Sequence, residues 1–186
     1  MGLRPGGRKA ALLAHVSTSV GWLGAVVVFL ALAVAGLRSR DDAVVPACYL
    51  AMDLTARYAI VPLAAGALVS GLVSSLGTPW GLLRHWWVLA KFALIVVAGV
   101  VLLLQLTPIA ALAQAAAGGE LAGDPGAAQW SGVRLSLIVH AAGGLLVLLA
   151  AMVLAVYKPR GMTRYGYRRT ATTARPAAAG RRPSGD

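Results

Sequence analysis

Residues 84–106 read RHWWVLAKFALIVVAGVVLLLQL, and this stretch decides the fold. From Trp86 onward the segment is almost entirely apolar. It is long enough for a helix to cross a bilayer core about 30 Å thick, which takes roughly 20 residues. Three other runs reach this length: Ala10 to Gly36, Thr55 to Leu76 and Leu135 to Tyr157. An open sheet edge cannot be satisfied in hydrocarbon, and the runs lack the alternation of a barrel strand, so they predict an all-α transmembrane four-helix bundle.

The composition of the whole chain agrees with this prediction. Of 186 residues, 59% are hydrophobic and 12% are charged, and the mean hydropathy is +0.75. Such values are typical of membrane proteins. The first apolar run is too long for the core of a signal peptide, so we expect it to be a permanent anchor. The one cysteine, Cys48, cannot form an intramolecular disulfide.

The basic residues are distributed unevenly around the four runs. Residues 1–9, the connection at Arg84 and the tail 158–186 carry twelve Lys and Arg residues, whereas the opposite side carries four, namely Arg38, Arg40, Arg57 and Arg134. Lys and Arg accumulate on the cytoplasmic face of membrane proteins, which predicts that both termini are cytoplasmic in a plasma (inner) membrane. Five of the six acidic residues then lie on the outer side.

This orientation explains the start of the stretch at residues 84–106. Arg84 marks the cytoplasmic interface, where Trp86 and Trp87 supply rings that favour the headgroup level. Lys91 lies about 7 Å further in, and its long stem can lift the ammonium group back toward water. A ligand-binding role for Lys91 is the alternative, because ionisable groups inside membranes are often functional.

The segments between the runs predict how the helices connect. Residues 77–81 (GTPWG) are rich in helix breakers, so the second and third helices should be antiparallel neighbours. The segment 44–54 is read as an outer approach to the second helix, and the Ala-rich piece after Leu106 as an extension that Gly118 and Gly119 end. The tail 158–186 is basic and poor in aliphatic residues, which indicates that it is largely disordered.

Small residues and one proline predict packing features. Small residues recur at every fourth position in two helices, a spacing that allows close approach of membrane helices. They are Ser17, Gly21 and Ala25 in the first helix and Gly66, Ser70 and Ser74 in the second; Gly143 and Gly144 offer the same in the fourth. Pro62 lies inside the second helix and should kink it, which would expose carbonyls that a neighbour or water must satisfy.

The three histidines are candidate ligands for haem or a metal. From the helical rise, His15 and His85 lie about 12 and 16 Å to the cytoplasmic side of the midpoints of their helices, whereas His140 lies about 9 Å to the outer side. His15 and His85 are therefore a candidate pair of axial ligands for a b-type haem, and Ser19 and Trp22 share the face of His15. The alternative is that each histidine makes a hydrogen bond between helices. No spacing favours zinc or di-iron.

A second polar group is predicted on the outer side. Asp53 and Arg57 are four residues apart, which lets them pair, and His140 lies at a similar depth. These three residues are candidates for a proton relay or an anion site, and the alternative is a purely structural cluster.

The net charge of +11 bears on partners. The cations of the tail adjoin the membrane, where anionic lipid attracts them with about 1 kcal/mol each. Because topology alone accounts for this placement, we expect membrane lipids rather than nucleic acid as partners. A second copy of the chain or another membrane protein is a further candidate. No phosphate-binding loop, nucleophile elbow or catalytic triad spacing is present.

The sequence resembles a family of small, uncharacterised four-helix membrane proteins from GC-rich bacteria, known as a domain of unknown function. The resemblance rests on residues 77–91 (GTPWGLLRHWWVLAK), 140–145 (HAAGGL) and 157–166 (YKPRGMTRYG), and it spans 52–166. It implies the fold and no activity. His15 followed by Trp22 is also similar to membrane domains of copper-resistance proteins of the CopD type, although methionine is sparse here.

Together these observations predict a domain of four helices within residues 10–157, with the helices at about 10–36, 55–76, 86–106 and 135–157. We expect a small polytopic membrane protein that is not an enzyme and acts as a scaffold, accessory subunit or permeation component. The alternative is a haem- or metal-binding electron carrier that uses His15 and His85.

Overall fold

The computed structural model describes residues 4–76, 86–121, 128–157 and 163. These residues form long helices, and no strand occurs among them. The helices are α1 (Pro5–Arg38), α2 (Val44–Thr55), the π-helical turn η1 (Ala56–Ile60), α3 (Val61–Leu76), α4 (Trp86–Ala117) and α6 (Ser131–Tyr157). Because α2, η1 and α3 follow one another without a break, they act as one span. Four spans in the described part of the chain are therefore long and apolar enough to cross a membrane, and the protein is an all-α, multi-pass membrane protein.

The helices extend beyond the predicted runs for local reasons. α1 begins at Pro5, a residue whose fixed φ suits the first turn of a helix. The segment expected as an approach to the second span is helical from Val44, where the Asp41 carboxylate accepts bonds from the backbone N–H groups of Ala43 (2.8 Å) and Val44 (3.4 Å). α4 continues through its Ala-rich end to Ala117, and Gly119 follows with a φ of +77°. Such a left-handed residue commonly ends a helix.

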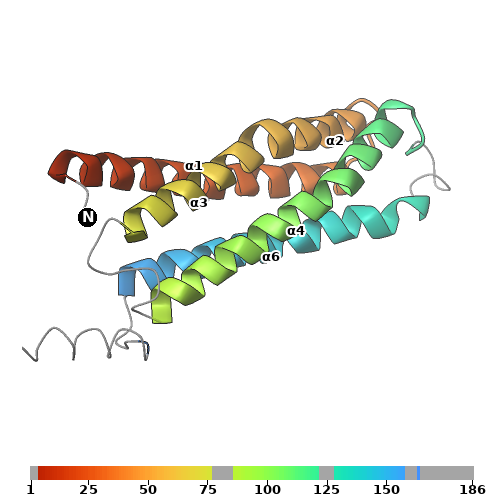
Figure 1. Cartoon of the computed structure of the whole chain (residues 1–186). Coiled ribbons are helices and arrows are strands. Elements are labelled where there is room, and N and C mark those ends of the chain that lie inside the picture. Colours follow the sequence, from red (N-terminus) through yellow and green to blue (C-terminus); the bar gives the residue numbers. More distant parts are fainter. Residues whose placement is uncertain (1–3, 77–85, 122–127, 158–162, 164–186) are drawn as a thin grey trace, which may run out of the picture.

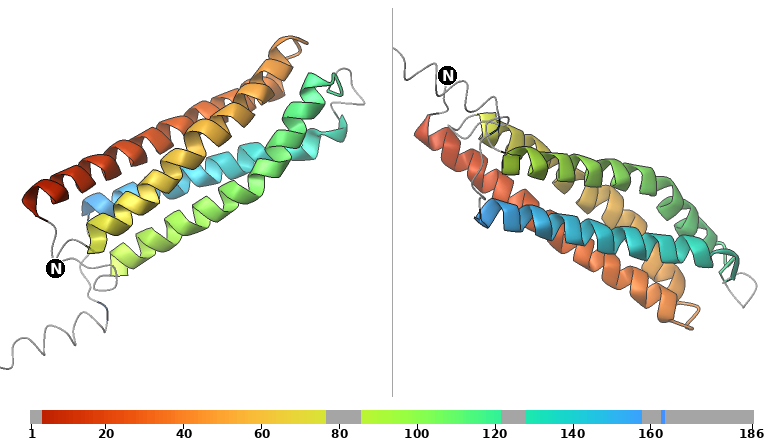
Figure 2. Two further views of the ribbon diagram at one scale, coloured as in Figure 1. Left: turned by 45° about the horizontal axis from the view of Figure 1, so that its top comes forward. Right: turned by 90° about the horizontal axis from the view of Figure 1, so that it is seen from below.

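The four spans form a ring in which each one packs on two neighbours. α1 packs on α3 and α6, and α4 packs on α2 and α6. Figures 1 and 2 show α1 and the α2–η1–α3 span on one side of the bundle and α4 and α6 on the other. We call the end where α1 begins and α6 finishes the terminal end, and the opposite end the far end. The spans α1 and α4 are thus diagonal to each other, as are α2–η1–α3 and α6.

The most extensive helix contact, between α1 and α3, is built on glycines. A Cβ atom at Gly66 would lie 2.9 Å from Cγ2 of Thr18, and one at Gly21 would lie 3.1 Å from Cδ2 of Leu63. Close approach at Gly21 and Gly66 confirms the packing predicted there. Gly143 and Gly144 differ, because a Cβ atom at either would meet nothing within 4 Å.

The π-helical turn η1 lies directly before Pro62. Proline has no N–H group for the carbonyl four residues earlier and its ring crowds that carbonyl, so the preceding turn has to adjust. Here the adjustment is a widened, π-helical turn over Ala56–Ile60. The kink at Pro62 stays a prediction. The turn brings Ile60 into the core, where it is 3% exposed.

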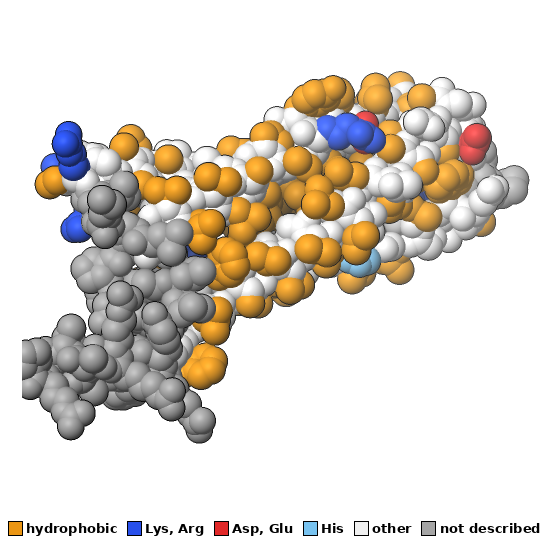
Figure 3. Space-filling model, viewed as in Figure 1, with side chains coloured by type: hydrophobic (Ala, Val, Ile, Leu, Met, Phe, Trp, Pro, Cys, Tyr) orange, Lys and Arg blue, Asp and Glu red, His pale blue; other side chains and the backbone are white. Residues whose placement is uncertain are grey.

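The outer surface of the described bundle is apolar along its length and charged mainly toward the ends (Figure 3). Large apolar side chains point outward from every span, including Leu13, Val69, Leu104 and Leu146. In lipid these side chains need no protein partner. Arg4, Arg8 and Lys9 lie at the terminal end. The far end carries both signs of charge: Arg38, Arg40, Asp41, Asp42 and Glu120.

Candidate functional site

The most buried charged residue in the described chain is Arg134, on the first turn of α6 at the far end. Its side chain is enclosed by two other spans and is 8% exposed. Nε donates to the Tyr49 hydroxyl of α2 at 2.6 Å, and Nη2 donates to the Gly36 carbonyl of α1 at 2.6 Å. The guanidinium carbon also lies 5.5 Å from the centre of the Tyr49 ring, within the range of a cation–π interaction. We call these three residues the far-end tie.

The far-end tie satisfies groups that the fold would otherwise leave without partners. Gly36 lies in the last turn of α1, where carbonyls lack an intrahelical donor and the helix dipole favours a cation. Glycine is required there, because a Cβ atom would lie 3.0 Å from Cζ of Tyr49 and 3.2 Å from Cβ of Cys48. Sequence reasoning missed this site because it began the fourth helix at Leu135, leaving Arg134 outside. The available signal was an arginine at the edge of an apolar run with no acid nearby.

A second polar group joins α1, α3 and α4 in the terminal half of the bundle. Nδ1 of His15 lies 3.1 Å from the Ala67 carbonyl and 3.3 Å from Oγ of Ser70, and Nε2 lies 3.4 Å from Nζ of Lys91. A carbonyl can only accept, so Nδ1 carries the proton and Nε2 accepts from the ammonium group. The Ser70 hydroxyl donates to the Gly66 carbonyl at 2.5 Å, which leaves its oxygen free to accept from His15. We call His15, Ala67, Ser70 and Lys91 the terminal-end tie.

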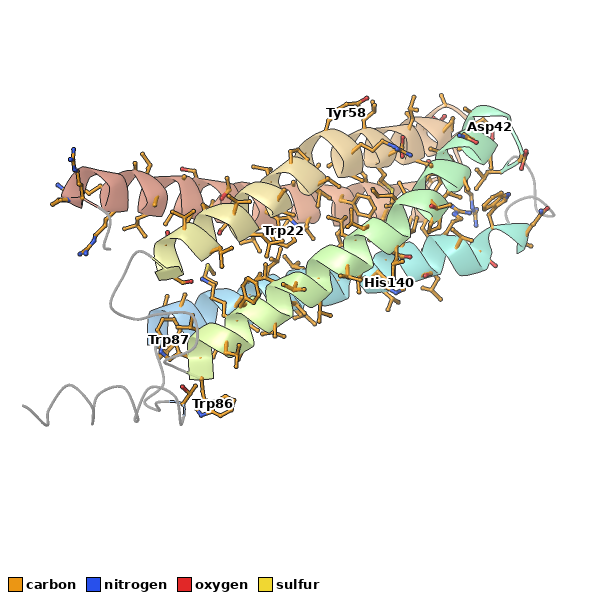
Figure 4. The ribbon with its side chains drawn as sticks, viewed as in Figure 1. Trp22, Asp42, Tyr58, Trp86, Trp87 and His140 are labelled. Carbon is orange, nitrogen blue, oxygen red and sulfur yellow. The ribbon has the colours of Figure 1, made fainter. Side chains whose placement is uncertain are left out.

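The terminal-end tie bears on several sequence predictions. Lys91 directs its ammonium group to His15, whereas we expected it to rise toward the headgroups. Gly71 gives the imidazole its room, because a Cβ atom there would lie 2.9 Å from Cε1 of His15. Trp86 is 60% exposed at the start of α4, beside Trp87 (Figure 4). Arg84, His85 and the tail 158–186 apart from Thr163 lie outside the described residues.

The predicted outer cluster is divided between two sides of the bundle. Nε of Arg57 donates to Oδ1 of Asp53 at 2.8 Å, and the two side chains are 44% and 18% exposed. Nδ1 of His140 lies 2.7 Å from the Ser136 carbonyl of its own helix, so it donates there. Figure 4 shows His140 on the side of the bundle opposite Tyr58, the neighbour of Arg57. The structure therefore brings Asp53 and Arg57 together and does not bring His140 to them.

An apolar cavity of about 300 Å³ lies between the two ties. α1, η1, α4 and α6 all line it. Its walls include Trp22, Phe29, Ile60, Gln105, Gly143 and Gly144, with His140 also in the lining. Trp22, Ile60 and Gly144 stand at or next to the midpoints of their spans, so the cavity is at mid-height in the bundle. His15, Ser19 and Trp22 are predicted to share one face of α1. Of these three residues, only Trp22 is part of the described lining.

The described residues contain no group of three or more His, Cys, Asp or Glu side chains that could hold a metal ion. No family model, no curated protein and no solved structure matches this chain. The resemblances noted from the sequence therefore stay predictions, and the candidate site rests on the two ties and the cavity.

Proposed function

We propose that this protein is a non-enzymatic scaffold or accessory subunit of the cytoplasmic (inner) membrane. One observation carries the proposal: the side chains of Arg134 and Lys91 face inward, and each forms hydrogen bonds with other helices. Arg134 bonds to α1 and α2, and Lys91 bonds to a histidine of α1 that is itself tied to α3. Such groups stabilise a bundle, whereas a catalytic centre would need them directed at a substrate.

Permeation is less well supported by the arrangement of these groups. His15 and Gly36 are 21 residues apart on α1, so the ties are separated by about 32 Å along the helix. Between them the described lining of the cavity is almost wholly apolar. A charged solute would have to cross that level without partners, which is costly in a low-dielectric medium. We therefore favour a scaffold over a channel.

Photo-crosslinking in the membrane tests the scaffold proposal. A photoreactive amino acid is placed in turn at Leu13, Val69, Leu104 and Leu146, one exposed position on each span. A scaffold should give a discrete protein adduct from one or two of these faces, with a second copy or another membrane protein, and none from the others. Lipid adducts alone at all four positions would contradict the proposal.

We also propose that both termini are cytoplasmic. The distribution of Lys and Arg over the whole sequence supports this orientation, with twelve on the side of the termini and four on the opposite side. Single cysteines at Ser75 and Gly119, in a Cys48→Ala background, test it with a membrane-impermeant maleimide added to intact cells. Gly119→Cys should react and Ser75→Cys should stay unlabelled until the cells are opened. The reverse pattern would place both termini outside.

A haem-binding electron carrier is the second candidate. Its support is that Lys91 of α4 reaches His15 of α1, so these spans approach each other in the terminal half of the bundle. Both ring nitrogens of His15 have protein partners, so iron would have to replace the Lys91 contact. Absorbance spectra of the purified protein, oxidised and then reduced with dithionite, test this candidate. A Soret band lost in His15→Ala and His85→Ala would support it, and a colourless protein would exclude it.

A further inference from the structure

The central cavity contains a hydrogen-bond donor with no acceptor. Nε2 of Gln105 is buried and has no hydrogen-bond partner among the described residues, and Gln105 lines the cavity. An amide without a partner is costly in an apolar environment, and buried polar groups in proteins are nearly always bonded. Filling the cavity with an alkyl chain would leave this cost in place. A ligand oxygen that accepts from Gln105 would remove it.

The depth of Gln105 limits where that oxygen can come from. Gln105 lies about 5 Å along the helix from the midpoint of α4, at 1.5 Å per residue. The cavity is at mid-height in the other spans as well. The ester carbonyls of a phospholipid lie at the edge of the hydrocarbon core, roughly 15 Å from its centre. A phospholipid in its ordinary position therefore places only methylene groups beside Gln105.

The shape of the lining favours a ring compound. Trp22 and Phe29 of α1 contribute two aromatic side chains, 3% and 5% exposed, and Gly143 and Gly144 of α6 leave open space. A volume of about 300 Å³ is at the small end of the range for small-molecule sites. Ile60, the last residue of the π-helical turn η1, also lines the cavity. Turns of this kind are frequent at functional sites.

His140 of α6 is also part of the lining, and its side chain is exposed. Because Nδ1 donates to the Ser136 carbonyl, the neutral ring has its lone pair on Nε2. The remaining described lining is almost wholly apolar, so Gln105 is the polar side chain on which the proposal rests. A ring carbonyl oxygen can accept from its amide, whereas a hydrocarbon cannot.

We propose that the central cavity binds a lipid-soluble ring compound of the quinone class, with the Gln105 amide donating to a ring carbonyl. The ring would occupy the space between the aromatic side chains of α1 and the glycine pair of α6. This binding role goes beyond the proposed scaffold and does not depend on it.

Binding of 2-methyl-1,4-naphthoquinone to the full chain in nanodiscs tests the proposal. Quenching of tryptophan fluorescence is followed against the quinone concentration, and 2-methylnaphthalene provides the same ring system without carbonyls. Protein-free nanodiscs give the partition of each compound into lipid, and the bound amount is corrected for it. The quinone should show saturable quenching. Gln105→Leu should weaken quinone binding about five- to tenfold, the value of one lost hydrogen bond, and leave the hydrocarbon unaffected.

Two glycine substitutions provide a matched pair. Gly143→Leu places a side chain in the cavity and should abolish saturable quenching. Gly24→Leu makes the same change on an exposed part of α1, where a Cβ atom also meets nothing within 4 Å, and should bind as the wild type does. Circular dichroism and size-exclusion chromatography confirm folding of each variant. Equal binding of quinone and hydrocarbon, or wild-type binding by folded Gly143→Leu, would overturn the proposal and leave a cavity that lipid tails fill.

Discussion

The two ties hold opposite ends of the bundle with cations of different kinds. At the far end Arg134 is 8% exposed and makes two bonds of 2.6 Å, whereas in the terminal half Lys91 is only partly buried and lies 3.4 Å from its acceptor. A guanidinium is planar, carries five donors and stacks on aromatic rings, so it can serve several helices at once. An ammonium on a flexible stem makes a looser contact. We infer that the far end is the firmer of the two.

The ties also cross different diagonals of the four-span ring. The far-end tie joins α6 to α2, and the terminal-end tie joins α1 to α4. The two ties add hydrogen bonds between spans that are not neighbours in the ring, one tie toward each end. Breaking one tie should therefore loosen one end of the bundle and leave the other in place.

The largest effect is expected from Arg134→Met. This change removes two charge-assisted hydrogen bonds and leaves the Gly36 carbonyl without its donor, which should lower the free energy of unfolding by about 2–4 kcal/mol. Unfolding in mixed micelles of increasing dodecyl sulfate content measures it. Hydrogen exchange should rise in the last turn of α1 and the first turns of α2 and α6. A loss under about 0.5 kcal/mol would show that the far-end tie is not a stabilising link.

Gly71→Ala should be the next most harmful change. The added methyl group would lie 2.9 Å from Cε1 of His15, so the imidazole must move and its bonds must lengthen. Overpacking of this kind costs about 1–3 kcal/mol. Gly24→Ala is the matched control, because the methyl group has open space there and alanine favours a helix. Equal stability of the two variants would contradict the close contact between α1 and α3.

Lys91→Met should cost less than either change. It removes a single long hydrogen bond between helices, and such bonds in membrane proteins average about 0.6 kcal/mol. The same unfolding measurement applies, and increased hydrogen exchange should be confined to the terminal half of α1 and α4. A cost equal to that of Arg134→Met would show that the two ends are held equally firmly.

Arg57→Met should have the smallest effect. Its partner Asp53 is on the same span, so the ion pair links no two helices. Pairs of opposite charge four residues apart on one helix contribute about 0.2–0.5 kcal/mol. A loss above about 1 kcal/mol would mean that Arg57 has a role in packing as well.

The spans could be predicted from the sequence, because length and apolarity act locally. Pro62 indicated an irregular second span, but the sequence did not predict the π-helical turn before it. The close contacts at Gly21 and Gly66 also followed from a local spacing. The ends of the helices were harder to predict from the sequence. Val44 begins a helix where the Asp41 carboxylate accepts from backbone N–H groups, and Arg134 belongs to α6, where it contacts other spans. Local rules do not contain these tertiary contacts.

The candidate site was only partly accessible from the sequence. His15, Lys91 and the Asp53–Arg57 pair stand out as ionisable residues in or near apolar runs. The groups that bond to buried polar side chains do not stand out in the sequence. Ala67 and Gly36 each contribute a backbone carbonyl, which every residue has. The cavity depends on what side chains leave empty: Gly143 and Gly144 suggested close packing, and the structure leaves open space beside them.

A double-mutant cycle between Arg134→Met and Tyr49→Phe tests the central claim most directly. Tyr49→Phe removes only the hydroxyl that accepts from Arg134, so both single changes break the same bond. If the cation is a structural link between α6 and α2, the free energies of unfolding in mixed micelles should be non-additive by about 1 kcal/mol or more. Additivity within about 0.3–0.5 kcal/mol would contradict the claim, because the two residues would then act independently.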